Sequence, residues 1–374
     1  MNRNLLFVAL ALFTWGFGEG LFFNFQPIYL KSLGSNEQQI GFILGAFGVA
    51  MAVTHIPAGR LADKFGRRPL MLSAWLVGLI STIMMASARA LPLFVAGMLA
   101  YGLTAFVASP LNSYVTAARG KWSVGTALSL STATFSMGMV LGPVTGGWIG
   151  DRYGMRMSYW VSAVVFFISC LLLVFIQSQP IDRHNHKSPP PSLVANRRLI
   201  GFFGVMAFAV FAMYLAQPLT PNFIKDVRNF SLSEVGIVFT FGALGNSLLS
   251  ILLSRFSPRS GYLYAQACAM LFTLIVWYSA SLPVIALGYF LLGGFRAARP
   301  LAMAQARELV HDSQMGLTYG AMETISSIIF IVTPPLAGFL YARNSTMLYP
   351  IGAALIAVSI VVSYIYTYRS ASHA

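Results

Sequence analysis

Residues 59–69 read Gly59-Arg60-Leu61-Ala62-Asp63-Lys64-Phe65-Gly66-Arg67-Arg68-Pro69. This stretch lies between two long apolar segments, residues 40–57 and 70–88, so we expect a short charged loop between two membrane-spanning helices. The glycines let helix ends approach closely and turn sharply. The aspartate in the middle can pair with arginine or with the N-terminus of a neighbouring helix.

The composition of the chain also indicates a membrane protein. Of its 374 residues, 57% are hydrophobic and 9% are charged, and the mean hydropathy is +0.72. These are too few charges to cover a soluble globule of this size. No segment alternates as the strands of a β-barrel do, and the first apolar segment is too long for a signal peptide. A membrane helix needs roughly 20 apolar residues, and twelve segments qualify, near residues 5–30, 39–60, 69–88, 91–114, 125–150, 157–178, 199–222, 233–255, 261–281, 283–306, 316–342 and 347–367.

The order of residues 59–69 resembles the signature G-x-L-a-D-r-x-G-r-r, which lies between the second and third helices of the Major Facilitator Superfamily. The resemblance covers the whole chain and implies an all-α membrane protein with two pseudo-symmetric six-helix bundles. It also implies a gate in which Asp63 pairs with basic residues of its own loop or with the start of helix 11 near Gly316. The gating residues are Gly59, Asp63, Gly66, Arg67 and Arg68. The alternative is a solvated positive loop that only orients the protein.

The formal charge of +14 is distributed as topology requires. With a cytoplasmic N-terminus and twelve crossings, 15 of the 24 Lys and Arg residues fall on the inner side, seven on the outer side, and Arg296 and Arg299 within helix 10. This excess fits the positive-inside rule with both termini cytoplasmic. We therefore expect contacts with membrane lipids, not with nucleic acid, and a location in the plasma membrane, the inner membrane of a bacterium.

A polar, proline-rich segment, residues 179–198, divides the chain almost in half. It is expected to be a cytoplasmic linker between an N-terminal bundle, residues 1–178, and a C-terminal bundle, residues 199–374. His184 and His186 within it have no further ligands nearby, so we expect no metal and no cofactor.

The two halves repeat each other at a nearly constant spacing. Pro143 and Gly147 match Pro334 and Gly338 at a spacing of 191, and further matches pair Leu91-Pro92 with Leu282-Pro283, Gly102 with Gly293, and Gly125 with Gly316. Pro27 and Lys31 match Pro221 and Lys225 at a spacing of 194. Such a duplication builds two bundles related by an axis along the membrane normal.

A second motif lies in the fifth expected helix, at Gly138-Met139-Val140-Leu141-Gly142-Pro143-Val144-Thr145-Gly146-Gly147. Gly138, Gly142 and Gly146 share one helical face and form a groove for a neighbouring backbone, and Pro143 can bend the helix. The order resembles g-x-x-x-G-P-x-x-G-G, a motif associated with exporters of the superfamily, particularly drug/proton antiporters. A tight helix contact without further function is the simpler interpretation, and the two are compatible.

The fourth expected helix departs from those antiporters. They carry the pattern R-x-x-q-G, whereas this chain has Met98-Leu99-Ala100-Tyr101-Gly102, so Met98 replaces the arginine. A proton-coupling mechanism that uses this arginine therefore does not transfer to this chain.

Charged residues within the expected helices are functional candidates, because each costs about 2.5–3.5 kcal/mol on insertion scales unless it faces the protein interior. Arg296, Arg299 and Glu323 lie at similar depth, so they either pair or bind an anionic substrate. Glu19 has no partner at its own depth that the sequence identifies. Burial favours the neutral form of a carboxyl group, so Glu19, followed by Glu323, is the candidate proton-coupling residue.

The resemblance also implies a central cavity lined by helices 1, 4, 7 and 10. Aromatic and amide groups with few charges suit an amphipathic or lipophilic substrate better than a hydrated sugar. The candidate substrate-binding residues there are Trp15, Asn24, Gln26, Asn112, Tyr214, Gln217, Arg296 and Arg299.

These features together predict a monomeric secondary active transporter that works by alternating access and exports amphipathic or lipophilic small molecules in exchange for protons. An importer or symporter of a small organic anion, a lipid or lysolipid flippase, and a non-transporting scaffold or sensor stay open as alternatives. The sequence contains no recognisable catalytic triad or phosphate-binding loop, so we do not expect an enzyme.

Overall fold

The computed structural model describes residues 3–179, 196–310 and 314–371, and for residues 55–65 and 367–371 it describes the backbone alone. All regular secondary structure in these residues is helical. Within these described ranges, twelve helices are long and apolar enough to cross a membrane. The prediction of an all-α protein with twelve transmembrane helices is confirmed.

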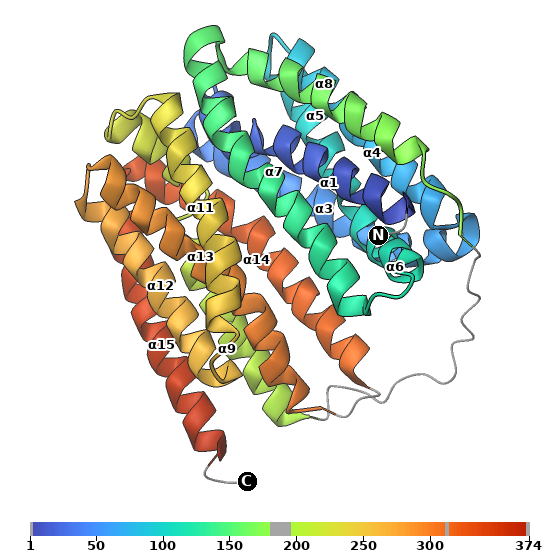
Figure 1. Ribbon diagram of the computed structural model, residues 1–374. Coiled ribbons are helices and arrows are strands. Elements are labelled where there is room, and N and C mark those ends of the chain that lie inside the picture. The colour runs from blue at the N-terminus through green and yellow to red at the C-terminus, as the bar shows by residue number, and fades with distance from the viewer. Residues whose placement is uncertain (1–2, 180–195, 311–313, 372–374) are drawn as a thin grey trace. The chain divides into compact units, whose positions relative to one another are not determined.

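The first half of the chain contributes the following elements, in order: α1 (Arg3–Gly20), the 3₁₀ turn η1 (Phe23–Phe25), α2 (Gln26–Ser32), α3 (Glu37–Phe65), α4 (Arg67–Ser87), α5 (Leu91–Gly102), the 3₁₀ turn η2 (Leu103–Val107), α6 (Ala108–Ala118), α7 (Val124–Tyr153) and α8 (Met155–Val174). The second half contributes α9 (Arg197–Tyr214), α10 (Thr220–Asn222), the π turn η4 (Phe223–Val227), α11 (Leu232–Leu253), α12 (Pro258–Tyr278), α13 (Leu282–Arg307), α14 (Met315–Arg343) and α15 (Leu348–Ala371). Figure 1 shows these helices in chain order from blue to red.

The expected loop at residues 59–69 is mostly helix, which corrects the prediction. α3 continues to Phe65, and only Gly66 separates it from α4. Arginine, leucine, alanine and lysine favour helix, so the helix continues through the charged residues. The turn occurs at Gly66, whose φ is +85°, a backbone conformation that residues with a side chain rarely adopt.

Three expected helices, the first, fourth and seventh, are interrupted. The first breaks between α1 and α2, the fourth at η2 between α5 and α6, and the seventh after α9. Pro27 and Pro221 each lie in the first turn of the segment that follows a break. A proline is compatible with the start of a helix but cannot continue a preceding one, because it lacks an N–H group.

The helices cluster into two compact units. Unit 1 contains residues 1–35, 46–185 and 230–240, and unit 2 contains residues 36–45, 186–229 and 241–374. The first turns of α3 therefore cluster with unit 2, and the first turns of α11 with unit 1.

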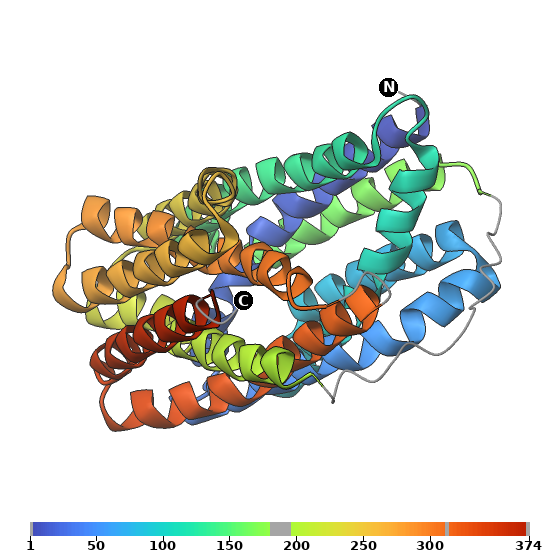
Figure 2. The same cartoon turned by 90° about the horizontal axis from the view of Figure 1, so that it is seen from below.

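Helix packing follows the same pattern in both units. In unit 1, α1 packs against α7 and α8, and α4 packs against α5 and α8, as the blue, cyan and green ribbons of Figure 1 show. In unit 2, α9 packs against α14 and α15, and α12 packs against α13 and α15. Figure 2 shows the red α15 beside the yellow-green α9. Each of these contacts in one unit has its counterpart in the other, as the sequence repeat predicts.

Candidate functional site

The carboxylate of Glu19 lies inside unit 1 and is held by two side chains. The indole Nε1 of Trp15, one turn earlier on α1, donates to Oε2 of Glu19 over 3.2 Å. Tyr101, near the end of α5, forms a further side-chain hydrogen bond with Glu19. The sequence identified no partner for Glu19, and the structure corrects this, because Tyr101 reaches it from a different helix.

Aromatic rings surround this carboxylate. Trp15 stacks on Phe166 at a ring-centroid distance of 4.0 Å and an interplanar angle of 5°, and its centroid lies 4.9 Å from that of Trp75. Tyr101 meets Phe22 edge-on at 5.5 Å. Glu19 is partly buried against this cluster. In such low-dielectric surroundings a hydrogen bond to a charged group is stronger than in water.

Two glycines make room for the aromatic cluster. A Cβ atom at Gly78 would lie 2.2 Å from the Trp15 indole, and one at Gly18 would lie 2.6 Å from the Phe166 ring. Any larger residue at either position would have to displace a ring. These glycines, like Tyr101, were not identified from the sequence, because their role depends on helices that meet only in the tertiary structure.

The other candidate residues of the first half lie in different environments. Trp15 is only 8% exposed and Gln26 only 2%, and the Nε2 atom of Gln26 has no hydrogen-bond partner among the described residues. Asn24 in η1 is partly buried, and Asn112 in α6 is exposed. The burial of Trp15 places it among the residues that hold Glu19, and a direct contact with substrate would require it to move.

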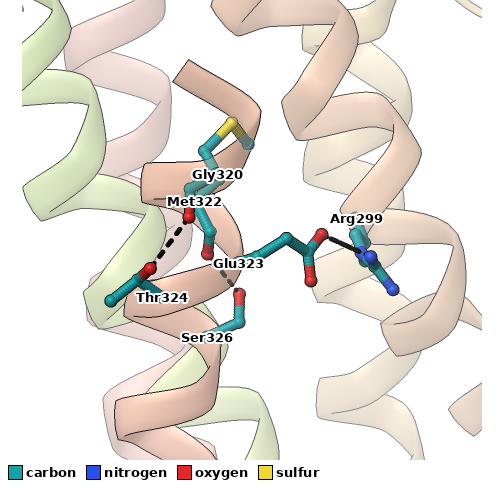
Figure 3. A network of polar contacts seen from close by, with 6 residues as sticks. All are labelled: Arg299, Gly320, Met322, Glu323, Thr324 and Ser326. Atoms are coloured by element: carbon teal, nitrogen blue, oxygen red, sulfur yellow. Dashed lines mark hydrogen bonds and ion pairs between the residues drawn. The ribbon is translucent and has the colours of Figure 1, made fainter. Parts of the chain in front are cut away.

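In unit 2, Arg299 of α13 forms an ion pair with Glu323 of α14 (Figure 3). Its Nε donates to Oε1 of Glu323 over 2.8 Å, and its Nη2 donates to the same oxygen. The sequence analysis suggested that Arg299 and Glu323 pair because they lie at similar depth, and this pair is present. The pair is not buried, since the two side chains are 63% and 43% exposed.

The hydroxyls next to this ion pair bond to their own helix. Thr324 Oγ1 donates to the carbonyl of Gly320, and Ser326 Oγ donates to that of Met322, each over 2.9 Å. Among the six residues drawn in Figure 3, Arg299 is the one that binds the Glu323 carboxylate.

An aromatic group lies close to Arg296 in unit 2. The Tyr214 ring stacks on Phe295 at 5.9 Å and meets Phe330 edge-on at 4.8 Å. Arg296 is exposed and lies within electrostatic range of the Tyr214 hydroxyl. Gln217 donates through Nε2 to the carbonyl of Met213 over 2.8 Å, so this amide bonds to its own segment.

The residues of the charged motif are only partly described. Gly59 and Asp63 lie in the segment of which the structure describes the backbone alone, so the expected pairing of the Asp63 side chain stays a prediction. Arg68 donates through Nη2 to the carbonyl of Val174, the last residue of α8, over 2.9 Å. Arg67 reaches Oε1 of Gln179 at 3.5 Å. Both arginines thus interact at the C-terminal end of α8, where a cation is favourable to the helix dipole.

The glycines of the fifth expected helix, α7, contact the backbone of α1. A Cβ atom at Gly138 would lie 2.3 Å from the carbonyl oxygen of Phe13, and one at Gly142 would lie 2.6 Å from Cα of Gly20. A Cβ atom at Gly146 would lie 2.2 Å from the carbonyl oxygen of Leu21. The glycine spacing predicted a close approach of a neighbouring backbone, and this approach is present. The neighbour is α1, the helix that carries Glu19.

Comparison with known proteins identifies the family. The family model of the Major Facilitator Superfamily matches residues 8–261 and residues 202–374. The chain belongs to this superfamily of membrane transporters, and it is not an enzyme.

Curated relatives resemble the chain over nearly its whole length at low identity. Multidrug resistance protein 2 of Bacillus subtilis is 22% identical in an alignment that covers 92% of this chain and 90% of that protein. Multidrug resistance protein MdtG of Proteus mirabilis is 26% identical in an alignment that covers 92% of this chain and 85% of MdtG. Quinolone resistance protein NorA of Staphylococcus aureus is 22% identical, over 96% of each.

Solved structures confirm the fold. The nucleoside transporter NupG superposes with a TM-score of 0.80 at 14% identity, covering 98% of this chain and 99% of its own. The human organic anion transporter MFSD10 superposes with a TM-score of 0.70 at 18% identity, covering 96% and 99%. At such identities the likeness concerns the fold alone.

Proposed function

We propose that this transporter exports amphipathic or lipophilic small molecules in exchange for protons, by alternating access. The observation that carries the proposal is the Glu19 carboxylate, held by Trp15 and Tyr101 among aromatic rings in unit 1. A carboxyl group in such a place changes between a charged and a neutral form as it releases or takes up a proton. Loading of a proton and loading of a cationic or polar substrate then oppose each other through charge and desolvation.

The relatives support the direction of transport. Three of them carry names of multidrug or quinolone resistance proteins, and they match nearly the whole chain. The glycine and proline pattern of α7 resembles the motif associated with exporters, and in the structure it packs α7 on α1. Export is therefore the direction that both the relatives and the motif favour.

The chemistry of the side chains supports the substrate class. Tyr214, Phe295 and Phe330 form an aromatic group in unit 2 beside the exposed guanidinium of Arg296. Aromatic rings with few charged groups favour a substrate with apolar surface and one or two polar groups.

Import of a small organic anion is the second candidate function. The observation that favours it is the pair of exposed arginines, Arg296 and Arg299, on one face of α13. Glu323 already neutralises Arg299, however, so an anion at that site would first have to displace a carboxylate. This argues for the proton-coupled exporter over the anion importer.

We further propose that the protein is a monomer in the plasma membrane with both termini in the cytoplasm. The excess of basic residues in the loops assigned to the inner side supports this orientation. The 179–198 segment would then be a cytoplasmic linker between the bundles of residues 1–178 and 199–374.

Glu19→Gln tests the coupling. The glutamine keeps the shape of the side chain and imitates its neutral form, so we expect uphill transport driven by a pH gradient to be lost while passive substrate exchange remains. The measurement uses proteoliposomes with an imposed pH gradient and a panel of lipophilic dyes, lysolipids and organic anions.

The matched control is Glu308→Gln, which removes an exposed carboxylate that pairs with Arg259 outside this cluster. We expect it to retain pH-driven transport. Uphill transport by Glu19→Gln with the pH profile of the unmodified protein would show that coupling occurs elsewhere. Transport of lysolipids alone would favour a flippase, and transport of organic anions alone would favour the importer.

A further inference from the structure

The last turns of α7 carry an exposed arginine beside two exposed aromatic rings. The guanidinium carbon of Arg152 lies 5.9 Å from the centroid of the Trp148 ring and 6.0 Å from that of the Tyr153 ring. The two rings meet edge-on at a centroid distance of 6.1 Å. Both distances from the guanidinium fall within the range in which a cation is attracted to the face of an aromatic ring.

The second half of the chain repeats this arrangement. At a spacing of 191, Arg343 corresponds to Arg152, and Phe339 corresponds to Trp148. The guanidinium carbon of Arg343 lies 4.3 Å from the centroid of the exposed Phe339 ring. Each arginine lies in the last turn of its helix, where a positive charge is favourable to the helix dipole. An arginine on an aromatic ring therefore ends α7 in one half and α14 in the other.

An apolar stripe leads along each helix to its arginine. Three large apolar side chains are exposed at corresponding positions, Met137, Leu141 and Trp148 in α7, and Ile328, Val332 and Phe339 in α14. Fifteen residues separate the first member of each stripe from the arginine, which is about 22 Å along the helix axis. Half of a bilayer core is about 15 Å thick. Each stripe is therefore long enough to lie along the acyl chains of one leaflet.

The guanidinium groups of both arginines keep their donors available. Among the described residues, neither Arg152 nor Arg343 forms a hydrogen bond or an ion pair. Stacking on a ring occupies the face of a guanidinium group and leaves its five N–H donors at the edge. These donors form a planar fork that matches the oxygens of a phosphate group. Each helix thus presents a phosphate-binding group at the end of an exposed apolar stripe.

The acidic residue next to Arg152 has other partners. Both oxygens of the Asp151 carboxylate accept from backbone, Oδ1 from the N–H of Leu232 and Oδ2 from that of Ser233. In the second half the corresponding residue is Ala342, which has no charge. The described residues of the two stripes therefore offer no carboxylate for the amine of a zwitterionic headgroup. The charge of both places favours a headgroup with a net negative charge.

The number of crossings relates the two arginines to the membrane. α7 is the fifth and α14 the eleventh of the twelve candidate spans, so each ends on the side of the membrane opposite the N-terminus. We propose that α7 and α14 each bind one anionic phospholipid, whose phosphate accepts from Arg152 or Arg343 and whose acyl chains lie along the apolar stripe. The inference uses the charges and the stripes, not the substrate, direction or coupling of transport.

Lipid binding to the purified full chain in detergent tests both sites. Native mass spectrometry counts the bound lipids and gives their dissociation constants during titration with phosphatidylglycerol or with phosphatidylcholine of the same acyl chains. We expect two phosphatidylglycerol molecules to bind about fivefold more tightly than phosphatidylcholine, the effect of one basic residue near an anionic membrane surface. Glycerol 1-phosphate should not displace them, because it has no acyl chain to place on a stripe.

Three single variants and one double variant assign the two lipids to residues. Arg152→Gln and Arg343→Gln should each weaken one of the two phosphatidylglycerol sites about fivefold. In the double variant, both lipids should bind with the same affinity. The matched control is Arg89→Gln, since Arg89 is exposed in the connection between α4 and α5, on the same side of the membrane but outside both stripes. This control should keep both tight sites.

Four results would overturn the proposal. They are equal affinity of the unmodified protein for the two lipids, two tight sites in the double variant, an equal loss in Arg89→Gln, and displacement of the lipids by glycerol 1-phosphate. The last result would indicate a site for a soluble phosphate compound. The experiment involves neither substrate nor a proton gradient, so each of these results leaves the proposed export function untouched.

Discussion

At the scale of single residues, the surroundings of each charged group decide what it can do. Glu19 and Glu323 look alike in the sequence, each a carboxylate within an apolar helix. Glu19 accepts hydrogen bonds from Trp15 and Tyr101. Neither of these two side chains carries a positive charge that would neutralise the carboxylate. Glu323 is neutralised by Arg299. The proposed role of Glu19 in carrying a proton fits this difference, because protonation of Glu323 would break its ion pair with Arg299.

The ion pair of Arg299 and Glu323 allows a prediction about stability. Because the side chains are 63% and 43% exposed, we expect Arg299→Gln or Glu323→Gln to lower the free energy of unfolding by about 1 kcal/mol or less. The double substitution should be close to the unmodified protein. Thermal unfolding of the purified single and double variants in detergent measures the coupling.

A destabilisation of about 3–5 kcal/mol by either single substitution, with recovery in the double variant, would contradict this prediction. It would show that the pair is desolvated in the membrane. Substrate binding is measured on the same variants, since an anion site at Arg299 would lose binding without a change in stability.

At the scale of elements, α7 uses two sets of small residues for two neighbours. Gly138, Gly142 and Gly146 contact the backbone of α1, and Gly147 contacts the first residue of α11. Adjacent positions in a helix point in directions about 100° apart, so Gly146 and Gly147 can serve different neighbours. The motif thus positions α1, and with it Glu19, largely through close backbone contacts.

Gly142→Ala tests this contact. Its added methyl group would lie 2.6 Å from both Cα of Gly20 and the carbonyl oxygen of Phe17, and these are backbone atoms that cannot rotate away. We expect the free energy of unfolding to fall by about 1–3 kcal/mol. Thermal unfolding and pH-driven transport are measured together, since a shift of α1 would also move Glu19.

Gly204→Ala is the matched control. Gly204 lies within α9, and a Cβ atom there would meet nothing within 4 Å. Alanine favours helix over glycine by about 1 kcal/mol, so this variant should be as stable as the unmodified protein or more stable. If Gly142→Ala behaved in the same way, the packing of α7 on α1 would tolerate an extra methyl group, and the motif would need another explanation.

At the scale of the whole molecule, the duplication explains why the packing partners recur. α1 with α7 and α8 corresponds to α9 with α14 and α15 in the other unit. The two acidic residues Glu19 and Asp151 do not recur in this way. Glu19 corresponds to Met213 at a spacing of 194, and Asp151 corresponds to Ala342 at a spacing of 191. The two halves share a scaffold and differ at these two acidic positions.

The proposed orientation in the membrane is testable with the two ends of α12. Ser254, before α12, and Ala280, after it, are both exposed. With both termini cytoplasmic, we expect a membrane-impermeant maleimide to label Ala280→Cys in intact cells and to label Ser254→Cys only after permeabilisation. Both variants carry Cys170→Ala and Cys268→Ala. The reverse pattern would place the termini outside and overturn the assignment from loop charge.

The sequence by itself determined the fold class, the number of membrane helices, the duplication and the family. Each of these depends on local apolar length, on motif order or on a constant spacing, all of which can be read along the chain. It also identified Glu19 and Arg299 as residues of interest, because a charge in an apolar helix is conspicuous.

Only the tertiary structure decided the partners of these residues. Tyr101 reaches Glu19, Gly78 makes room for Trp15, and Asp151 binds the start of α11 across large separations in the chain. Residues 59–65 also form part of α3 instead of the expected loop, because charged residues of high helix propensity can continue a helix beyond the apolar segment. Local periodicity defines a helix and its apolar length, but hydrogen bonds and close backbone contacts between helices depend on how the helices pack.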